Sequence, residues 1–140
     1  MTNTMAIRSA ALSGFLAVAL GAFGAHGLKE ILTRHGTAGI WETAVFYHFI
    51  HTMMLYWMAQ RRPVPTGPWL SFFTGIVIFS GSLYLLAVIP PGGMRWLGAM
   101  TPIGGVSFLV GWLWLAFTAT ATAGESSSPA GSPVTKSFNK

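Results

Sequence analysis

The feature that most constrains this chain is the near absence of charge over four long apolar segments. They cover residues 9–26, 41–60, 69–89 and 101–121, and only 8% of the 140 residues are charged, against about 25% in soluble domains. At about 1.5 Å per residue, a helix of ~20 residues spans a hydrocarbon core of ~30 Å. Lipid offers the backbone no hydrogen-bonding partner, so each segment is expected to be helical. The predicted fold is an all-α membrane protein, a bundle of four transmembrane helices.

The polar stretches between these segments mark where the helices are expected to end. Residues 61–68 read RRPVPTGP and residues 90–93 read PPGG, and proline and glycine at this density do not continue a helix. Thr101 and Pro102 are typical of a helix N-cap and its first residue. The stretch 28–35 mixes apolar and charged residues at helical spacing, which predicts a short interfacial helix after the first span.

Residues 1–123 are expected to form one transmembrane domain. From about residue 124 the sequence is small, polar and proline-containing, which predicts a disordered tail over 124–140. A cleaved signal peptide is the competing interpretation of the first segment, because Arg8 precedes its apolar run. That run is as long as a full span and three more follow, so we expect a span.

Composition and charge exclude several kinds of site. The chain has no cysteine, which excludes disulfides, thiolate metal ligands and cysteine nucleophiles. Its net charge of +5 comes from basic residues scattered singly or in pairs beside apolar runs, so we expect no nucleic-acid partner. With four spans, three basic residues fall on one side, and five fall on the side of both termini: Arg8, Arg61, Arg62, Lys136 and Lys140. The positive-inside rule then places both termini in the cytoplasm.

Small residues recur along the first segment and predict close packing of helices. Ala10, Gly14, Ala17, Gly21 and Gly24 follow one another at three- and four-residue steps, which places them along one helix face. Small residues let helix backbones approach closely in lipid. The same role is expected in the third and fourth segments for Gly75, Gly81, Gly104, Gly105 and Gly111.

The second segment carries the candidate chemistry, in the stretch WETAVFYHFIHTMMLYW. At about 100° per residue, His48, His51 and Thr52 fall on one face, with Tyr47 just outside its edge. Unpaired polar groups are costly in hydrocarbon, so this face is expected to point into the bundle. Glu42 lies off this face, in the first turn of the predicted helix.

Several roles are open for these histidines. Neutral His48 and His51 could hydrogen-bond to hydroxyls of the third segment and lock the bundle. They could bind a metal with His26 from the end of the first segment, although no carboxylate or thiolate completes the set. Haem ligation by His26 and His51 is conceivable. A proton relay is a further alternative, but it lacks a buried acid to hand protons onward.

We expect hydrogen bonding with no bound metal and no cofactor, because the spans offer three histidines and no acid at their depth. No nucleophile and base stand in a catalytic arrangement, and no phosphate loop is present, so we expect no enzyme. The candidate polar pocket comprises His26, Tyr47, His48, His51, Ser80, Ser82 and Tyr84.

Four blocks of sequence resemble a known family. They are ALGAFGAHGLK at 19–29, WETAVFYHFIH at 41–51, FSGSLYLLA at 79–87 and TPIGGVSFLVGW at 101–112. In this order they are similar to the YgdD-like inner-membrane family, domain of unknown function 423. A more distant similarity is to mitochondrial transmembrane protein 256. The resemblance covers about residues 7–120 and implies a small four-span protein of the inner membrane without an established activity.

The family pattern implies which residues matter in this chain. In many members glutamine occupies the position of His48, which implies a hydrogen-bonding role there and leaves His26 and His51 as the better candidates for function. The pattern carries over to Gly21, Gly24, His26, Tyr47, His51, Ser80, Gly81, Ser82, Tyr84, Thr101, Pro102, Gly104 and Gly105.

Two functions from different classes follow. The first is a structural or accessory bundle in the lipid bilayer that associates with another membrane protein or with a second copy of itself. It predicts an exposed groove of small residues and no internal cavity. The second is a small transporter or ligand-binding protein with a wet crevice around His26, His51 and residues 80–84. We favour the first, as a non-enzymatic, multi-pass protein of the cell inner membrane.

Overall fold

Every regular element in the described part of the chain is a helix, which confirms the predicted all-α class. The structure, a computed structural model, describes residues 1–90, 92, 93 and 95–125, and the predicted tail lies outside these residues from 126 onward. The elements in chain order are α1 (Asn3–Ala25), α2 (Lys29–His35), α3 (Ala38–Ala59), α4 (Thr66–Gly75), the π-helical segment η1 (Ile76–Ser80), α5 (Gly81–Val88) and α6 (Arg95–Glu125).

The four apolar segments become four long helices, because α4, η1 and α5 continue into one another and form a single helix, the α4–α5 helix. Among the described residues, three stretches are long and apolar enough to cross a membrane: Asn3–Ala25, Thr66–Val88 and Trp96–Thr118. With 22 residues, α3 is about 33 Å long, yet it is not among them. Its two histidines, Glu42 and its hydroxyl-bearing residues lower its mean hydropathy. Length and composition therefore support three spans directly.

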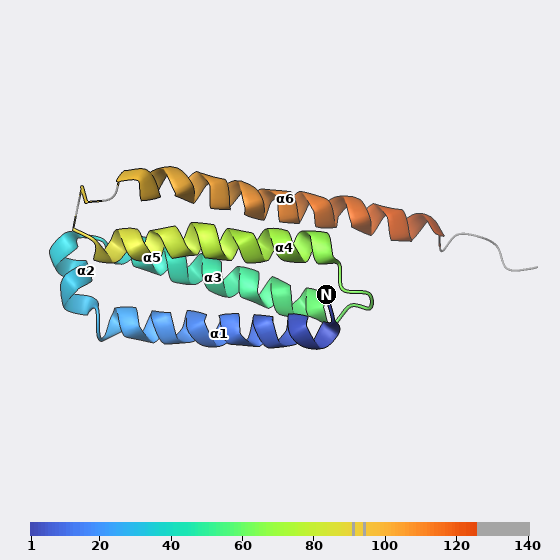
Figure 1. The fold of residues 1–140 in the computed structure, drawn as a ribbon, viewed down its shortest axis with the longest axis horizontal. Coiled ribbons are helices and arrows are strands. Elements are labelled where there is room, and N and C mark those ends of the chain that lie inside the picture. Colours follow the sequence, from blue (N-terminus) through green and yellow to red (C-terminus); the bar gives the residue numbers. More distant parts are fainter. Residues whose placement is uncertain (91, 94, 126–140) are drawn as a thin grey trace, which may run out of the picture.

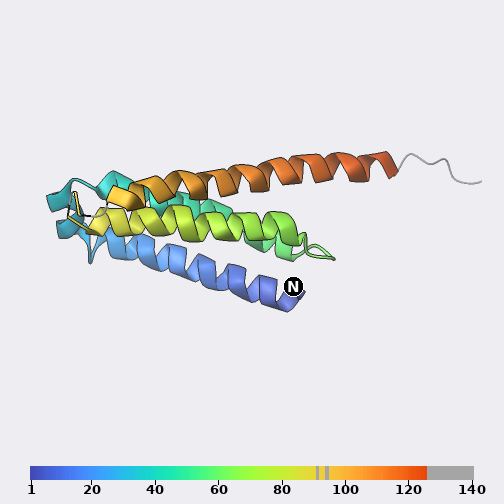
Figure 2. The same ribbon diagram turned by 45° about the horizontal axis from the view of Figure 1, so that its top comes forward.

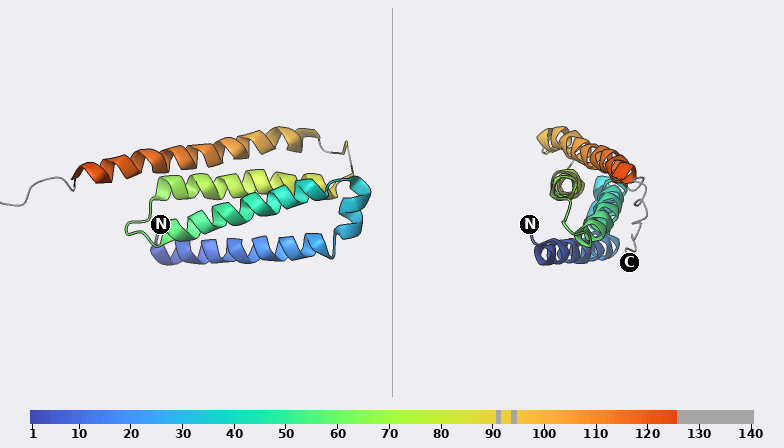
Figure 3. Two further views of the ribbon diagram at one scale, coloured as in Figure 1. Left: turned by 180° about the vertical axis from the view of Figure 1, so that it is seen from behind. Right: turned by 90° about the vertical axis from the view of Figure 1, so that its right-hand side faces the viewer.

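The long helices form an open row rather than a closed ring. The backbone of α1 lies close to those of α2 and α3, whereas α6 lies close to α4, η1 and α5. Figure 1 shows the helices running side by side, with α2 standing across the ends of α1 and α3. Figure 2 shows α6 extending past the other helices. The end-on view in Figure 3 separates α1 from α6, so α3 and the α4–α5 helix form the middle of the row.

Side chains at the start of the chain tie α1 to the end of α3. Thr2 Oγ1 accepts a hydrogen bond from the backbone N–H of Met5 at 3.3 Å and caps α1. The side-chain amide of Asn3 donates to the carbonyls of Ala59, at 3.2 Å, and Arg61, at 3.0 Å. These carbonyls belong to the last residue of α3 and to the turn that follows it, where no further helical N–H is available to them. The two helix ends are therefore held together.

The short helix predicted over 28–35 is confirmed as α2. It ends at Gly36, whose φ of 68° lies in the left-handed region that favours glycine. Thr37 Oγ1 then donates to the carbonyl of Ala87 at 2.6 Å, which ties the start of α3 to the end of α5. Four residues on, the Trp41 indole N–H donates to the carbonyl of Leu20 in α1 at 3.0 Å. The start of α3 is thereby bonded on two sides.

The predicted helix start at Thr101 is wrong, because Pro102 lies inside α6 rather than in its first turn. A proline in a helix lacks its N–H and crowds the carbonyl four residues before it. That residue is Gly98, beside which the structure leaves open space. Thr101 Oγ1 donates to a carbonyl of the preceding turn at 3.2 Å and lies 2.8 Å from Ser82 Oγ of α5. Threonine at this position therefore makes a contact between helices and does not cap one.

Two apolar clusters lie towards opposite ends of the bundle. The first joins the start of α1, the end of α3, the α4–α5 helix and α6 through Ala6, Ala10, Leu55, Met58, Ala59, Val64, Trp69, Phe72, Ile76 and Phe108. The second joins α2, α3 and α5 through Leu32, Trp41 and Ala87. Between the clusters, each of the three adjoining helices contributes buried polar side chains, namely Ser13, His48, Thr52 and Ser80.

Candidate functional site

A chain of hydrogen bonds crosses the middle of the bundle, and we name it the polar layer: Ser13, His48, Thr52 and Tyr84. Ser13 Oγ of α1 lies 2.6 Å from Thr52 Oγ1 and 3.1 Å from His48 Nε2, both on α3. His48 Nδ1 lies 3.2 Å from the hydroxyl of Tyr84 on α5. A neutral imidazole has one donor and one acceptor nitrogen, so both nitrogens of His48 are used. The polar layer therefore bonds three helices to one another.

The second histidine occupies a separate contact, the His51 contact, formed with Phe108 and Trp112 of α6. His51 Nδ1 lies 2.8 Å from the carbonyl oxygen of Tyr47, and since a carbonyl only accepts, this nitrogen carries the proton. Nε2 is then the acceptor, and it receives the indole N–H of Trp112 at 3.3 Å. The His51 ring stacks on Phe108 with centroids 3.6 Å apart and planes at 11°.

The two histidines do not share a site. The sequence predicted that His48 and His51 face the same way, but α3 lies between two neighbours. The three-residue step directs His48 towards α1 and α5, and His51 towards α6. Within the described residues, no three His, Asp or Glu side chains gather where they could hold a metal ion. The lone pair of His51 Nε2, which a metal would need, already accepts a hydrogen bond.

His26 lies apart from both histidines. It follows the last residue of α1 and is exposed, on a surface hollow that it shares with Lys29, Glu30, Thr33 and Arg34. The expected pocket that joined His26 to His51 is therefore not formed. The prediction placed the two residues on the same side of the membrane, but His26 lies beyond the end of α1, whereas His51 is buried one turn past the middle of α3.

The serines of the third segment fall into different surroundings. Ser82 Oγ donates to the carbonyl of Phe79 at 2.9 Å and lies beside Thr101 of α6. Ser80 is the last residue of η1, and its hydroxyl is fully buried without a hydrogen-bond partner in the described part of the chain. Tyr47 is half-exposed, and its ring packs against Phe79 at a centroid distance of 4.7 Å.

The expected packing glycines differ in how closely they are approached. A Cβ atom on Gly24 would overlap the Trp41 indole, and one on Gly104 would overlap the backbone of Phe79. Gly81 instead has open space beside it, so the packing role expected for it is wrong: its face points into a gap beside α1. At three other glycines, a Cβ atom would find its nearest side-chain neighbour at 3.3 Å for Gly21, 3.5 Å for Gly14 and 3.7 Å for Gly105.

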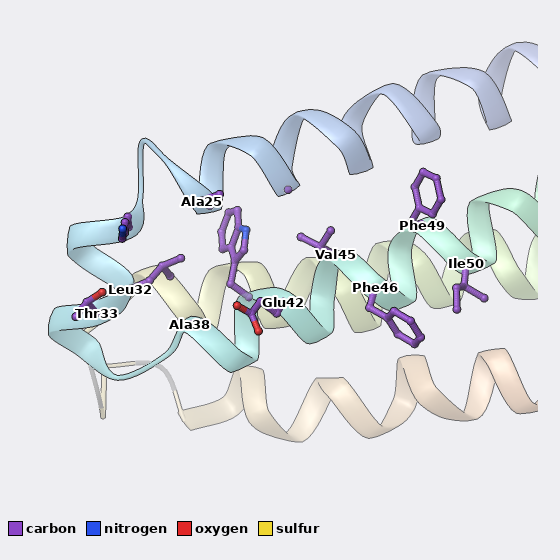
Figure 4. Close-up of a pocket in the computed structure, with 13 residues that line it drawn as sticks. Ala25, Leu32, Thr33, Ala38, Glu42, Val45, Phe46, Phe49 and Ile50 are labelled. Carbon is purple, nitrogen blue, oxygen red and sulfur yellow. The ribbon is translucent and has the colours of Figure 1, made fainter.

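Grooves lie on the outer side of the bundle, next to these contacts. One, of about 400 Å³, lies between α1 and the α4–α5 helix beside His48 and Tyr84. A second, of about 520 Å³, lies between α3 and α6 beside His51. A third, of about 630 Å³, is bounded by α1, α2 and α3 and includes Lys29 and Glu42. Figure 4 shows this third groove, which we name the α1–α3 groove.

Sequence reasoning did not single out three of the residues that make these contacts. Ser13 could have been found, because it follows Ala10 by three residues and precedes Ala17 by four, on the predicted small face. Trp112 gives no such signal, because a tryptophan in a span is as typical of a position that faces lipid as of one that faces another helix. Lys29 was counted for its charge alone, because only the fold brings it to the same groove as Glu42.

These features define a small helical membrane protein whose spans are joined by buried hydrogen bonds. The chain belongs to the family described as protein of unknown function (DUF423), whose sequence model matches residues 20–105. The family predicted from the four sequence blocks is thus confirmed.

Curated relatives agree with this assignment. The UPF0382 membrane protein YwdK of Bacillus subtilis is 42% identical over 78% of this chain and 90% of its own length. A UPF0382 membrane protein of Staphylococcus epidermidis is 44% identical over 81% of this chain and 93% of its own. The UPF0382 inner membrane protein YgdD of Escherichia coli is 43% identical over 80% of this chain and 86% of its own. No solved structure matches the chain.

Proposed function

We propose that this chain is a non-catalytic accessory protein of a cell inner membrane, which crosses the membrane four times and associates with another membrane protein through an edge of its helix row. The observation that carries the proposal is the open row itself. The outer faces of α1 and α6 expose large apolar side chains, such as Phe15 at 70% and Leu113 at 58%. The polar side chains of the spans mostly bond to one another instead.

The packing of α3 supports the proposal of four spans. This helix lies between α1 and the α4–α5 helix along its length, and both of these are long and apolar enough to cross. A helix in that position runs through the same layer as its neighbours. Three of its polar side chains, His48, His51 and Thr52, are buried in helix contacts, so lipid meets mainly apolar side chains along the middle of α3. The inner-membrane location is supported by the name of the Escherichia coli relative.

The alternative is a small transporter or ligand-binding protein that uses His26, His51 and the 80–84 segment. One observation favours it: the unpartnered hydroxyl of Ser80 at the end of a π-helical turn, a feature frequent at functional sites. Against it, His26 is on the surface and His51 is occupied by Trp112. The accessory role is therefore the better supported of the two.

Photo-crosslinking in intact native membranes tests the accessory role. A crosslinking side chain is placed at Phe15 on the α1 edge or at Leu113 on the α6 edge, with Ala44, which is fully buried on α3, as the control position. One discrete protein adduct is expected from one edge and none from Ala44. If both edges yield lipid adducts alone and the protein runs as a lipid-bound monomer, the accessory role is wrong.

A further inference from the structure

The α1–α3 groove combines an apolar wall with two opposite charges. Its apolar part includes Val45, Phe49 and Ile50 along α3, as Figure 4 shows, and its volume is about 630 Å³. Lys29, the first residue of α2, and Glu42, on α3, line the same groove. Figure 4 shows Glu42 nearer than Phe49 and Ile50 to the end that α2 covers. The groove is therefore polar near the helix ends and apolar along the span.

The two charges of the groove are available to a ligand. In the part of the chain that the structure describes, neither the Lys29 ammonium nor the Glu42 carboxylate makes a hydrogen bond or an ion pair, with each other or with another residue. The nearby charges of α2 do pair: Arg34 donates to Glu30 at 2.6 Å on an exposed face. Lys29 and Glu42 thus line one site without pairing with each other.

We propose that the α1–α3 groove binds one zwitterionic phospholipid with an ethanolamine head group. Lys29 contacts the phosphate, Glu42 accepts hydrogen bonds from the lipid ammonium, and one acyl chain lies along Val45 and Phe49. The proposal rests on the placement of α1 and α3 in the membrane put forward above, and it does not depend on the accessory role.

Charge complementarity selects this occupant over other lipids. An anionic lipid satisfies Lys29 and leaves Glu42 facing a second negative charge. A zwitterion satisfies both, because it carries a phosphate for Lys29 and an ammonium for Glu42. The side-chain hydroxyl of Thr33, which also lines the groove, adds a neutral donor on the phosphate side.

The carboxylate also distinguishes ethanolamine from choline. A primary ammonium has N–H donors for a charge-assisted hydrogen bond to Glu42, whereas a quaternary ammonium has none and is recognised by aromatic faces. The indole of Trp41, which also lines the groove, is turned inwards. It is 5% exposed, packs on Tyr84 at a centroid distance of 4.7 Å, and donates its N–H to Leu20. A choline head group therefore lacks an aromatic cage here.

Lipid retention by the full chain tests the proposal. The protein is reconstituted in nanodiscs that contain equal parts of phosphatidylethanolamine, phosphatidylcholine and phosphatidylglycerol with identical acyl chains. It is then released into mild detergent for native mass spectrometry. One ethanolamine lipid per protein is expected, with about tenfold enrichment over choline lipid, the factor that about 1.4 kcal/mol provides. Glu42→Gln should remove this preference and keep the binding, while Lys29→Gln should reduce retention of both zwitterionic lipids.

Glu30→Gln is the matched control, because it removes one carboxylate from the exposed face of α2 at a residue that does not line the α1–α3 groove. It should leave the lipid profile unchanged. Melting temperatures in detergent show that each variant is folded; the substituted side chains are exposed, so wild-type values are expected. The proposal is overturned if no lipid is retained, if phosphatidylglycerol is preferred, or if Glu42→Gln and Glu30→Gln retain the same lipid profile. If reporter fusions confirm four spans and no such lipid is bound, the proposed topology is retained and only the lipid site is rejected.

Discussion

At the scale of the residue, the two histidines of α3 show what a helical wheel can predict and what it cannot. The sequence could place His48, His51 and Thr52 away from lipid, because polar groups in hydrocarbon need partners, and all three are buried. It could not say which helix each side chain meets. That depends on how α3 is turned between two neighbours, so His48 reaches Ser13 while His51 reaches α6.

The first prediction at this scale concerns His48. In His48→Gln, the side-chain amide can both donate and accept, so it can keep the bonds to Ser13 and Tyr84, and stability should match that of the wild type. His48→Leu removes both bonds. Buried hydrogen bonds between membrane helices average about 0.6 kcal/mol each, so a loss of about 1–2 kcal/mol is expected. Thermal unfolding in detergent measures both variants, and a leucine variant as stable as the wild type would show that the polar layer does not stabilise the bundle.

A second prediction concerns metal binding by His51. Protein purified without chelator and without nickel resin should contain no stoichiometric zinc, iron or copper, because both ring nitrogens of His51 are engaged and a site for these metals needs several ligands. Elemental analysis is the measurement. Stoichiometric metal that disappears in His51→Ala would contradict the hydrogen-bonding role.

At the scale of the element, apolar length and proline-glycine punctuation were sufficient to predict all four long helices and α2. The exception is the start of α6. Thr101 and Pro102 match the statistics of a helix start, but those statistics do not include the contact of Thr101 with Ser82 across the helix pair. The π-helical turn η1 had no sequence signal either, since IVIFS is an ordinary apolar run.

A close approach between α6 and η1 provides a matched pair of glycines on α6. In Gly104→Ala, the added methyl group meets the backbone of Phe79, which cannot rotate aside, whereas in Gly105→Ala the nearest atom is 3.7 Å away. Overpacking costs about 1–3 kcal/mol, so Gly104→Ala should lower the melting temperature and Gly105→Ala should leave it nearly unchanged. Equal melting temperatures for the two variants would mean that α6 does not approach η1 as the structure shows.

At the scale of the whole molecule, the sequence indicated a compact bundle, and the structure is an open row. The small-residue face of α1 was expected to pack closely against another helix, and this is confirmed: Ala10 and Ala17 are buried in the structure, and α3 is the long helix that α1 packs against. Sequence periodicity identifies a packing face without naming the helix that covers it. Hence the order of the row, with α1 and α6 at its two edges, had to come from the structure.

The open row makes one prediction about topology. If α1, α3, the α4–α5 helix and α6 all cross the membrane, α2 and the two termini lie on opposite sides. Arg61 and Arg62 follow α3 directly and lie on the side of the termini. Basic residues close to span ends weigh most in the positive-inside rule, so this side should be cytoplasmic. Reporter fusions after Arg34 and after Lys140 should therefore report opposite sides, with a fusion after Arg62 matching the one after Lys140.

A charge variant tests whether Arg61 and Arg62 determine the orientation of the chain in the membrane. Replacing Arg61 and Arg62 by glutamine removes two of the three basic residues that lie close to spans on the terminal side. On the opposite side, Lys29, Arg34 and Arg95 remain. The balance of positive charge is then reversed, so a fraction of the chains should insert inverted and the reporters after Arg34 and Lys140 should each give mixed signals. Reporters on the same side in the wild type would show that α3 does not cross, because three crossings place the C-terminus with α2.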